Sequence, residues 1–361
     1  MTSLSRSGRS SIVAWFDERL GLSAALDFLR HKTVPVHRYS VWYYFGGVSL
    51  FLFGIQVGTG LLLLVYYKPT TETAFESVRF IVAQVPFGWL IRSLHSWAAN
   101  LMVLTVFVHM FSVYFLKAYR PPRELTWLTG MGILGLTLAF GFSGYLLPWN
   151  ELAFFATKVG TDIVGSVPAV GHVLLRYIRG GDDVSGATLT RFFGWHVALL
   201  PVLFFAVLGV HLLLVQRLGM STPLHPSARL RHMPFFPGFF FRDAILWLGV
   251  LGALITLCTF MPWELGAKAD PFASAPAGIR PEWYFTFLSQ SLKYVPARVF
   301  GIEGEVVGIT AAGLGGLFFL LVPFLDRRAA RGARSRVFTA IGVVVLVFIA
   351  TMTTLAYLKP Y

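Results

Sequence analysis

The stretch "RSLHSWAANLMVLTVFVHMF" (residues 92–111) decides how the chain folds, because it places His95 and His109 inside an apolar run. A polar side chain at membrane depth is costly unless it is used. On an α-helix, a separation of fourteen residues turns the chain to within about 40° of one face and advances it by about 21 Å. We therefore expect the two histidines on one helix face at two depths.

The composition is that of a membrane protein. Of the 361 residues, 56% are hydrophobic and only 13% are charged, which is unlike a soluble domain. A bilayer core of about 30 Å needs about 20 apolar residues. The sequence therefore predicts an all-α integral membrane protein with seven transmembrane helices, at roughly 40–67, 90–116, 126–147, 192–216, 241–262, 305–325 and 336–358.

Charge predicts the orientation of these spans. The N-terminal segment and the loops near 117–125, 217–243 and 326–336 hold 18 Lys and Arg against 6 Asp and Glu, whereas the opposite side holds 12 against 11. The positive-inside rule makes the first side, with the N-terminus, cytoplasmic. The C-terminus then lies outside. Because the basic residues are split among four short segments, we expect no nucleic-acid partner.

The sequence contains a second histidine pair with nearly the same spacing. In "RFFGWHVALLPVLFFAVLGVHLLLVQ" (191–216), His196 and His211 are fifteen residues apart. Both helices cross in the same direction, so His95 and His196 share an outer depth and His109 and His211 an inner one. Two imidazoles are natural axial ligands of a haem, whereas zinc takes three or four ligands. The spacing predicts two stacked b-type haems rather than four unconnected core histidines.

Other residues fit this arrangement. Gly46 and Gly60 are fourteen residues apart, as are Gly130 and Gly144, and small residues leave room between membrane helices for a flat cofactor. Arg92 precedes His95 by one turn. It is either a partner for the propionates of the outer haem or a snorkelling interfacial arginine. The single Cys258 excludes a thiolate metal cluster.

Several motifs carry a family resemblance. The stretches "IQVGTGLLLLVYYKP" (55–69), "SGYLLPWNELAFFATKV" (143–159) and "RPEWYFTFLSQSLKYVPARVFG" (280–301) resemble the cytochrome b subunit of quinol–cytochrome c (bc) and cytochrome b6f oxidoreductases. The resemblance divides the chain into three parts: an amphipathic surface segment (1–38), a cytochrome b6-like four-helix haem-binding domain (39–220), and a subunit IV-like three-helix domain with the PEWY loop (221–361).

The resemblance implies a mechanism. Quinol is oxidised at the outer side, one electron goes to a Rieske iron–sulfur partner, and the other crosses through both haems to an inner quinone-reducing site, with net proton translocation. Glu282 would accept a quinol proton, because a carboxylate in an apolar pocket has a raised proton affinity. The other PEWY residues, Pro281, Trp283 and Tyr284, would share its pocket. Asp243 matches an acid near the inner quinone site, or simply begins a helix.

The resemblance also implies partners and a location. The expected partners are the Rieske protein, a c-type cytochrome subunit, membrane lipid, quinol and quinone, and a second copy in a homodimer. The expected location is a bacterial cytoplasmic membrane. Another dihaem membrane anchor and a haem-free seven-span transporter remain the alternatives.

Two positions depart from the family pattern. Tyr44 stands where cytochrome b6 has the cysteine that tethers an extra haem, so we expect no covalent c-type haem. Ser112 stands where the family tends to have an arginine for the inner-haem propionate. Lys117 or Arg123 is expected to compensate.

Overall fold

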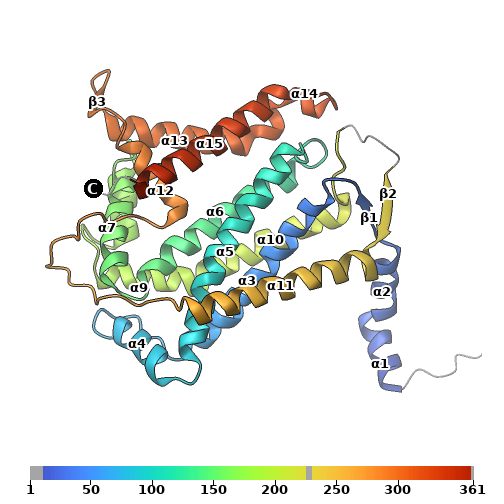
Figure 1. Cartoon of the computed structure of the whole chain (residues 1–361), viewed down its shortest axis with the longest axis horizontal. Coiled ribbons are helices and arrows are strands. Elements are labelled where there is room, and N and C mark those ends of the chain that lie inside the picture. Colours follow the sequence, from blue (N-terminus) through green and yellow to red (C-terminus); the bar gives the residue numbers. More distant parts are fainter. Residues whose placement is uncertain (1–10, 225–229, 359–361) are drawn as a thin grey trace, which may run out of the picture.

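The predicted seven-span helical fold is confirmed. The computed structural model describes residues 11–224 and 230–358. Within these ranges, seven helical segments are long and apolar enough to cross a membrane, and they run side by side in Figure 1. They are Ser40–Leu64, Gly88–Phe115, Glu124–Leu146, Gly186–Leu218, Phe235–Phe260, Gly304–Ala330 and Arg336–Leu358.

These spans are built from the longer helices. In chain order their elements are η1 (Ser40–Tyr43), α3 (Tyr44–Leu64), α5 (Gly88–Phe115), α6 (Glu124–Leu146), α9 (Gly186–Gly194), η2 (Trp195–Leu199), α10 (Leu200–Leu218), η3 (Phe235–Phe239), α11 (Phe240–Phe260), α13 (Gly304–Leu325), α14 (Arg327–Ala330) and α15 (Arg336–Leu358). The shorter elements are α1 (Ser11–Leu20), α2 (Leu22–His31), β1 (Thr33–Val36), α4 (Ala74–Gln84), α7 (Glu151–Gly165), α8 (Gly171–Arg179), β2 (Arg231–Pro234), α12 (Trp283–Leu292), β3 (Arg298–Val299) and β4 (Ile302–Glu303).

The first four spans form a bundle of two packed pairs. Helix α3 packs along α5, α6 packs along α10, and α5 also contacts α6. Leu52, Met102, Leu134 and Phe204 are at most 6% exposed in the shared core. Helix α5 carries His95 and His109, and the continuous segment of η2 and α10 carries His196 and His211, so the histidines lie on different pairs of one bundle.

The last three spans surround this bundle. Helix α11 packs against α5 and α3, α13 against α6, and α15 against α5. One buried contact ties α13 to the first bundle: the Tyr119 hydroxyl donates to Asp326 Oδ2 at 2.7 Å. Helix α12, which begins in the PEWY motif, packs against both α13 and α15.

Surface helices cover one end of the bundle. The loops 148–191 and 263–304 contain α7, α8 and α12, and the loop after α3 contains α4. Arg179, which is 2% exposed, holds two of the surface helices together, because its guanidinium donates to Thr161 Oγ1 at 2.7 Å and to Asp162 Oδ1 at 2.6 Å. The ordered loops form a fixed cap over the bundle.

The other end carries the N-terminal segment. Helices α1 and α2 lie across the end of the spans (Figure 1), as expected for a surface segment, of which residues 1–10 lie outside the described ranges. Strand β1 pairs antiparallel with β2, with Thr33 opposite Pro234. This small sheet was not predicted. It ties the N-terminal segment to the chain just before α11.

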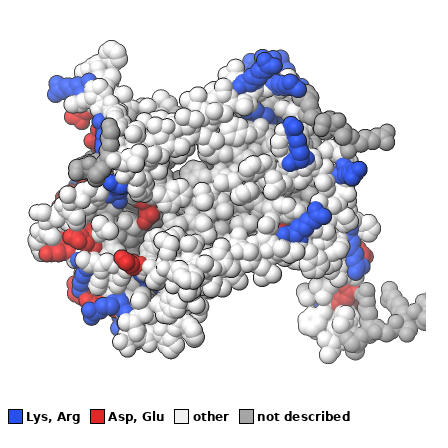
Figure 2. Space-filling model, in the orientation of Figure 1, with Lys and Arg blue, Asp and Glu red and all other residues white. Residues whose placement is uncertain are grey.

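Charge separates the two ends. Figure 2 shows most Asp and Glu at the end that carries α7, and mainly Lys and Arg at the end that carries α14. The surface between the two ends is almost free of charge, as a lipid-facing band requires. The membrane orientation remains a prediction from the positive-inside rule.

Candidate functional site

The outer histidine pair spans the gap between α5 and α10. His95 lies on α5 and His196 in η2, with ring centroids 6.3 Å apart and ring planes at 67°. An imidazole centroid lies about 1.1 Å from its nitrogen, so two metal–nitrogen bonds of about 2.0 Å require a separation of about 6 Å. The observed separation matches that requirement.

Hydroxyl groups set the tautomer of this pair. The Thr59 hydroxyl donates to the Ile55 carbonyl at 2.6 Å and therefore accepts from His95 Nδ1 at 2.9 Å. Likewise, the Ser143 hydroxyl donates to the Ala139 carbonyl at 2.8 Å and lies 3.1 Å from His196 Nδ1. A proton on Nδ1 leaves the Nε2 lone pair free for a metal, and such contacts usually orient ligating imidazoles.

The inner pair lies on the same two helical segments. His109 lies on α5 and His211 on α10. The Thr129 hydroxyl lies 3.0 Å from His211 Nδ1. His109 Nδ1 is buried and has no hydrogen-bond partner among the described residues. The inner pair is thus held by one hydroxyl rather than two.

Each of the four predicted glycines faces an imidazole. A Cβ atom at Gly60 would lie 3.4 Å from His95 Cε1, and one at Gly46 would lie 3.2 Å from His109 Cε1. On α6, a Cβ atom at Gly130 would lie 3.3 Å from His211 Cε1, and one at Gly144 would lie 2.6 Å from His196 Cε1. The glycines therefore make room for the histidine rings themselves. Gly144 is the tightest of the four.

A π-helical turn absorbs the longer spacing of the second pair. Residues Trp195–Leu199 form η2, and the Leu200 amide donates to the Trp195 carbonyl. Pro201, at the start of α10, lacks the amide proton that a regular helix would use here. One extra residue in a π turn brings fifteen-residue spacing close to the alignment that fourteen give in a regular helix.

These residues fit two haems better than isolated metal ions. Among the described residues, no group of three or more His, Cys, Asp or Glu is arranged to hold a metal ion. Each level instead offers two imidazoles from opposite sides of a gap. That donor set is the one expected of a bis-histidine haem.

A cavity of about 450 Å³ lies against the part of α5 that follows His95. Pro281, Glu282 and Trp283 line it, together with Trp97 and Asn100 from α5. Trp283 Nε1 donates to Asn100 Oδ1 at 2.8 Å, which fixes the PEWY segment against the helix that carries His95. Burial raises the pKa of the Glu282 carboxyl. The arrangement places a carboxyl of increased proton affinity in a largely apolar cavity.

Tyr284 turns away from this cavity toward α6. Its side chain is 6% exposed, and a Cβ atom at Gly141 would collide with its hydroxyl. Burial, together with the negative charge of Glu282, raises the pKa of Tyr284 above its usual range. Tyr284 therefore stays neutral, and it lines the long cavity between α5 and α15.

Arg92 has protein partners. It is 6% exposed, and its guanidinium donates to the carbonyls of Trp263 and Glu264. The Ser93 hydroxyl accepts from the Trp263 amide at 3.0 Å. Arg92 thus anchors the loop after α11 next to the outer pair, and its contact with a propionate remains a prediction.

Asp243, Tyr44 and Ser112 lie near the same end of the spans, on three different helices. Asp243 contacts the backbone of α3 at Gly47, where any side chain would collide with the carboxyl. Tyr44 stacks on Phe239 with ring centroids 4.7 Å apart. Ser112 donates to the His109 carbonyl at 2.7 Å. These residues define the inner ends of α3, α5 and α11.

The two residues expected to compensate for the arginine that Ser112 replaces, Lys117 and Arg123, make different contacts. Arg123 donates to the Leu218 carbonyl at 2.8 Å. Lys117, which is 4% exposed, has an Nζ atom without a hydrogen-bond partner among the described residues. The structure brings neither residue into contact with a histidine.

Sequence reasoning missed several residues of the site. Thr59, Thr129 and Ser143 each directly precede one of the four glycines, and Phe45 precedes the fourth. This repeated Thr-Gly or Ser-Gly pair was the signal for the hydroxyl contacts. Asn100 and Gly141 had no comparable signal, because their partners lie on the distant PEWY segment.

Comparisons with known proteins agree with this site. The family model described as "Cytochrome b/b6/petB" matches residues 30–219, and the model "Cytochrome b(C-terminal)/b6/petD" matches residues 268–360. The chain is 50% identical over 356 residues to a cytochrome bc complex cytochrome b subunit of Chlorobaculum thiosulfatiphilum, covering 97% of this chain and 82% of the relative.

Two further similarities cover different parts of the chain. Cytochrome b6 of Synechococcus sp. (strain JA-3-3Ab) is 43% identical over 215 residues, which are 60% of this chain and all of that one. A solved chain titled "Hyperthermophilic respiratory Complex III" superposes with a TM-score of 0.85 at 30% identity, covering 97% of this chain and 92% of that one. The chain belongs to the cytochrome b family, with a b6-like N-terminal part continuous with a petD-like C-terminal part.

Proposed function

We propose that the chain is the dihaem cytochrome b subunit of a bc-type quinol–cytochrome c oxidoreductase. One observation carries the proposal: α5 and η2 hold the His95 and His196 rings with their centroids 6.3 Å apart, and α5 and α10 carry a second histidine pair, fourteen and fifteen residues further along the chain. Family membership and the similarity to bc complex subunits support it.

In this proposal, His95 and His196 hold the outer haem through Nε2, and His109 and His211 hold the inner one. When bound, the haems supply one-electron redox centres at two depths of the membrane. The chain orients the ligands through the Thr59, Ser143 and Thr129 hydroxyls. The glycines admit the imidazole rings between the helices.

The cavity of about 450 Å³ against α5 is the proposed quinol-oxidising site. Oxidation of a quinol to a quinone releases two electrons and two protons. We assign Glu282 to accept a proton, because its carboxyl lies in this cavity with a raised pKa. Trp283 and Pro281 position it. One electron would go to a Rieske iron–sulfur partner and the other would enter this chain.

The inner ends of α3 and α11 are the proposed quinone-reducing site. Asp243 is assigned there as a proton donor, since its carboxyl lies against α3 at Gly47 and Oδ1 is buried without a hydrogen-bond partner among the described residues. Proton uptake at this end and release at the other end amount to proton translocation. A c-type cytochrome subunit and a second copy of the chain complete the proposed complex.

The test is quinol–cytochrome c reductase activity of the purified complex. We expect activity that is abolished by an inhibitor of outer-site quinol oxidation. A dihaem anchor of another oxidoreductase would contain haem but lack this inhibitor sensitivity. A haem-free transporter would show no reducible α-band at all.

A further inference from the structure

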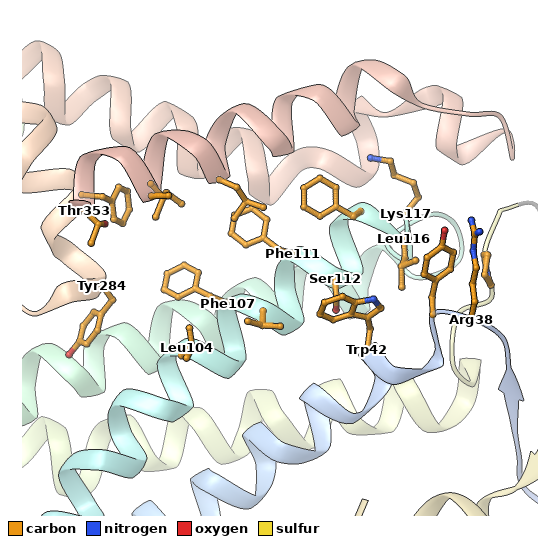
Figure 3. A pocket seen from close by; sticks show the side chains of 18 of the residues that line it. Arg38, Trp42, Leu104, Phe107, Phe111, Ser112, Leu116, Lys117, Tyr284 and Thr353 are labelled. Carbon is orange, nitrogen blue, oxygen red and sulfur yellow. The ribbon is translucent and has the colours of Figure 1, made fainter. Parts of the chain in front are cut away.

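A long cavity of about 1010 Å³ lies between α5 and α15. Its walls are apolar, with Phe107, Phe111, Leu346 and Ile349 along its length. Tyr284 and Thr353 lie at one end, and Arg38 and Lys117 at the other (Figure 3). The volume is at the upper limit of about 1,000 Å³ for small-molecule sites, and the cavity is elongated (Figure 3), so it has room for a large, extended ligand.

The cavity is longer than one leaflet of a bilayer, since on the α15 side its lining extends from Arg334, just before the helix, to Thr354. Along α5, its lining runs from Leu104 to Phe115, a rise of about 16 Å. Half of a hydrocarbon core is about 15 Å thick. A hydrocarbon chain that enters from the basic end would therefore be covered over its whole length.

The basic end holds three cations. Arg38 and Arg334 are exposed, and Lys117 is buried at 4% exposure. In the part of the chain that the structure describes, none of the three has an ion pair. Arg38 only covers the ring of Tyr39, at 4.4 Å. An anion that binds these groups would displace no carboxylate in ion-pair contact among the described residues, and Asp326 acts on Lys117 from beyond that range.

Lys117 is the side chain that most clearly points to an anionic ligand at this end. Its Nζ atom is buried without a hydrogen-bond partner among the described residues and lies 4.7 Å from the centroid of Tyr114. The neighbouring Asp326 is already occupied, because it accepts from Tyr119 and from the Ala329 amide. Burial lowers the pKa of Lys117 to about 8, against an opposing effect of Asp326. A buried unpaired ammonium is costly.

The backbone conformation of Lys117 also supports a ligand site. Lys117 has a φ of 53°, a left-handed conformation that glycine adopts readily and other residues rarely do. A lysine here costs backbone energy, and strained positions of this kind cluster at ligand sites.

We propose that the cavity between α5 and α15 binds one anionic phospholipid, with its phosphate held by Lys117, Arg38 and Arg334 and its acyl chains lying between the two helices. Lysine and arginine pair strongly with phosphate, and the apolar walls match the acyl chains. A neutral isoprenoid quinone has no group that needs three cations. The lipid belongs to the leaflet at the basic end.

Lipid retention by the purified holo-complex tests this site. After delipidation in detergent, the complex is incubated with phosphatidylglycerol or with phosphatidylcholine of the same chains, and the retained lipid is counted by mass spectrometry. We expect one retained phosphatidylglycerol, and retention of phosphatidylcholine about tenfold weaker.

The variants separate charge from fold. Lys117→Gly removes the ammonium where glycine suits the backbone, so the protein should fold and bind phosphatidylglycerol about tenfold more weakly. Ala350→Phe should block the acyl chains without changing charge. Arg328→Gln, which removes an exposed cation at the same end outside the cavity, is the control and should bind normally.

Two results would overturn the proposal. The first is equal retention of both lipids, or unchanged retention in Lys117→Gly. The second is a shift in the midpoint potential of the inner haem in Lys117→Gly without loss of lipid, which would assign Lys117 to a haem propionate instead.

Discussion

At the scale of single residues, the site depends on small groups around the imidazoles. Gly144 allows His196 to approach α6, and the Ser143 hydroxyl beside it fixes the ring. The histidines were predictable because polar side chains are rare in membrane spans and usually have a function there. The hydroxyl contacts were not predicted, because serine and threonine in membrane helices more often bond to their own backbone carbonyl. Thr59 and Ser143 do both.

Gly144→Ala should disturb the outer haem selectively. The new methyl would lie 2.6 Å from His196 Cε1, and overpacking of this kind costs about 1–3 kcal/mol. We expect one b-type component of the reduced-minus-oxidised spectrum to be lost or shifted. Gly135→Ala on the same helix, where nothing lies within 4 Å of the new methyl, is the control. Equal spectra for the two variants would contradict this account of the glycine.

Glu282→Gln should slow quinol oxidation by about 100-fold, the lower limit for loss of a general base. A carboxyl accepts a proton only when it is ionised, and burial raises the pKa of Glu282. The wild-type rate of quinol oxidation should therefore rise as the pH passes through this raised pKa. This rising part (limb) of the pH profile should be absent from the variant. Glu303→Gln, at an exposed position outside the cavity, should keep the wild-type profile, as measured by quinol–cytochrome c reductase assays. A retained pH limb in Glu282→Gln would refute the assignment.

At the scale of elements, the long spans were predictable and the short elements were not. Bilayer thickness fixes a length of about 20 residues, so all seven spans appear near their predicted positions. Strand β1 and its partner β2 join segments nearly 200 residues apart, and no local pattern encodes such a pairing. The π turn η2 was also missed. Its signals were Pro201 and the fifteen-residue spacing.

The π turn makes a prediction about helix register. Deletion of Ala198 from η2 should convert the turn to a regular helix and keep both haems, because only the extra residue is lost. Insertion of one alanine after Val202 in α10 should rotate His196 by about 100° relative to His211 and remove the outer haem. The haem spectrum reports both variants. Loss of the outer haem in the deletion variant would show that the turn itself is required.

At the scale of the whole molecule, the charge separation in Figure 2 accompanies a separation of sites. The cavity lined by Pro281, Glu282 and Trp283 lies at the end with α7, and the basic end of the cavity between α5 and α15 lies near α14. Composition predicted this polarity, because short basic loops decide the orientation of membrane proteins. The packing of α13 and α15 around the haem bundle was beyond sequence reasoning, since contacts such as Tyr119 with Asp326 join distant segments.

Labelling with a membrane-impermeant maleimide tests the orientation. Ser274→Cys, in the exposed loop before α12, should react in intact cells. Arg328→Cys, at the basic end, should react only after the membrane is opened. Cys258 is fully buried and should give little background. The reverse pattern would invert the proposed topology.

The stacked pair of bis-histidine haems is the central claim, and a potentiometric titration of the reduced-minus-oxidised spectrum tests it most directly. The purified wild-type complex is compared with His95→Ala and His211→Ala. We expect two b-type components of different midpoint potential, the first variant lacking one and the second lacking the other. Absence of haem from the wild type, or loss of the same component in both variants, would contradict the account.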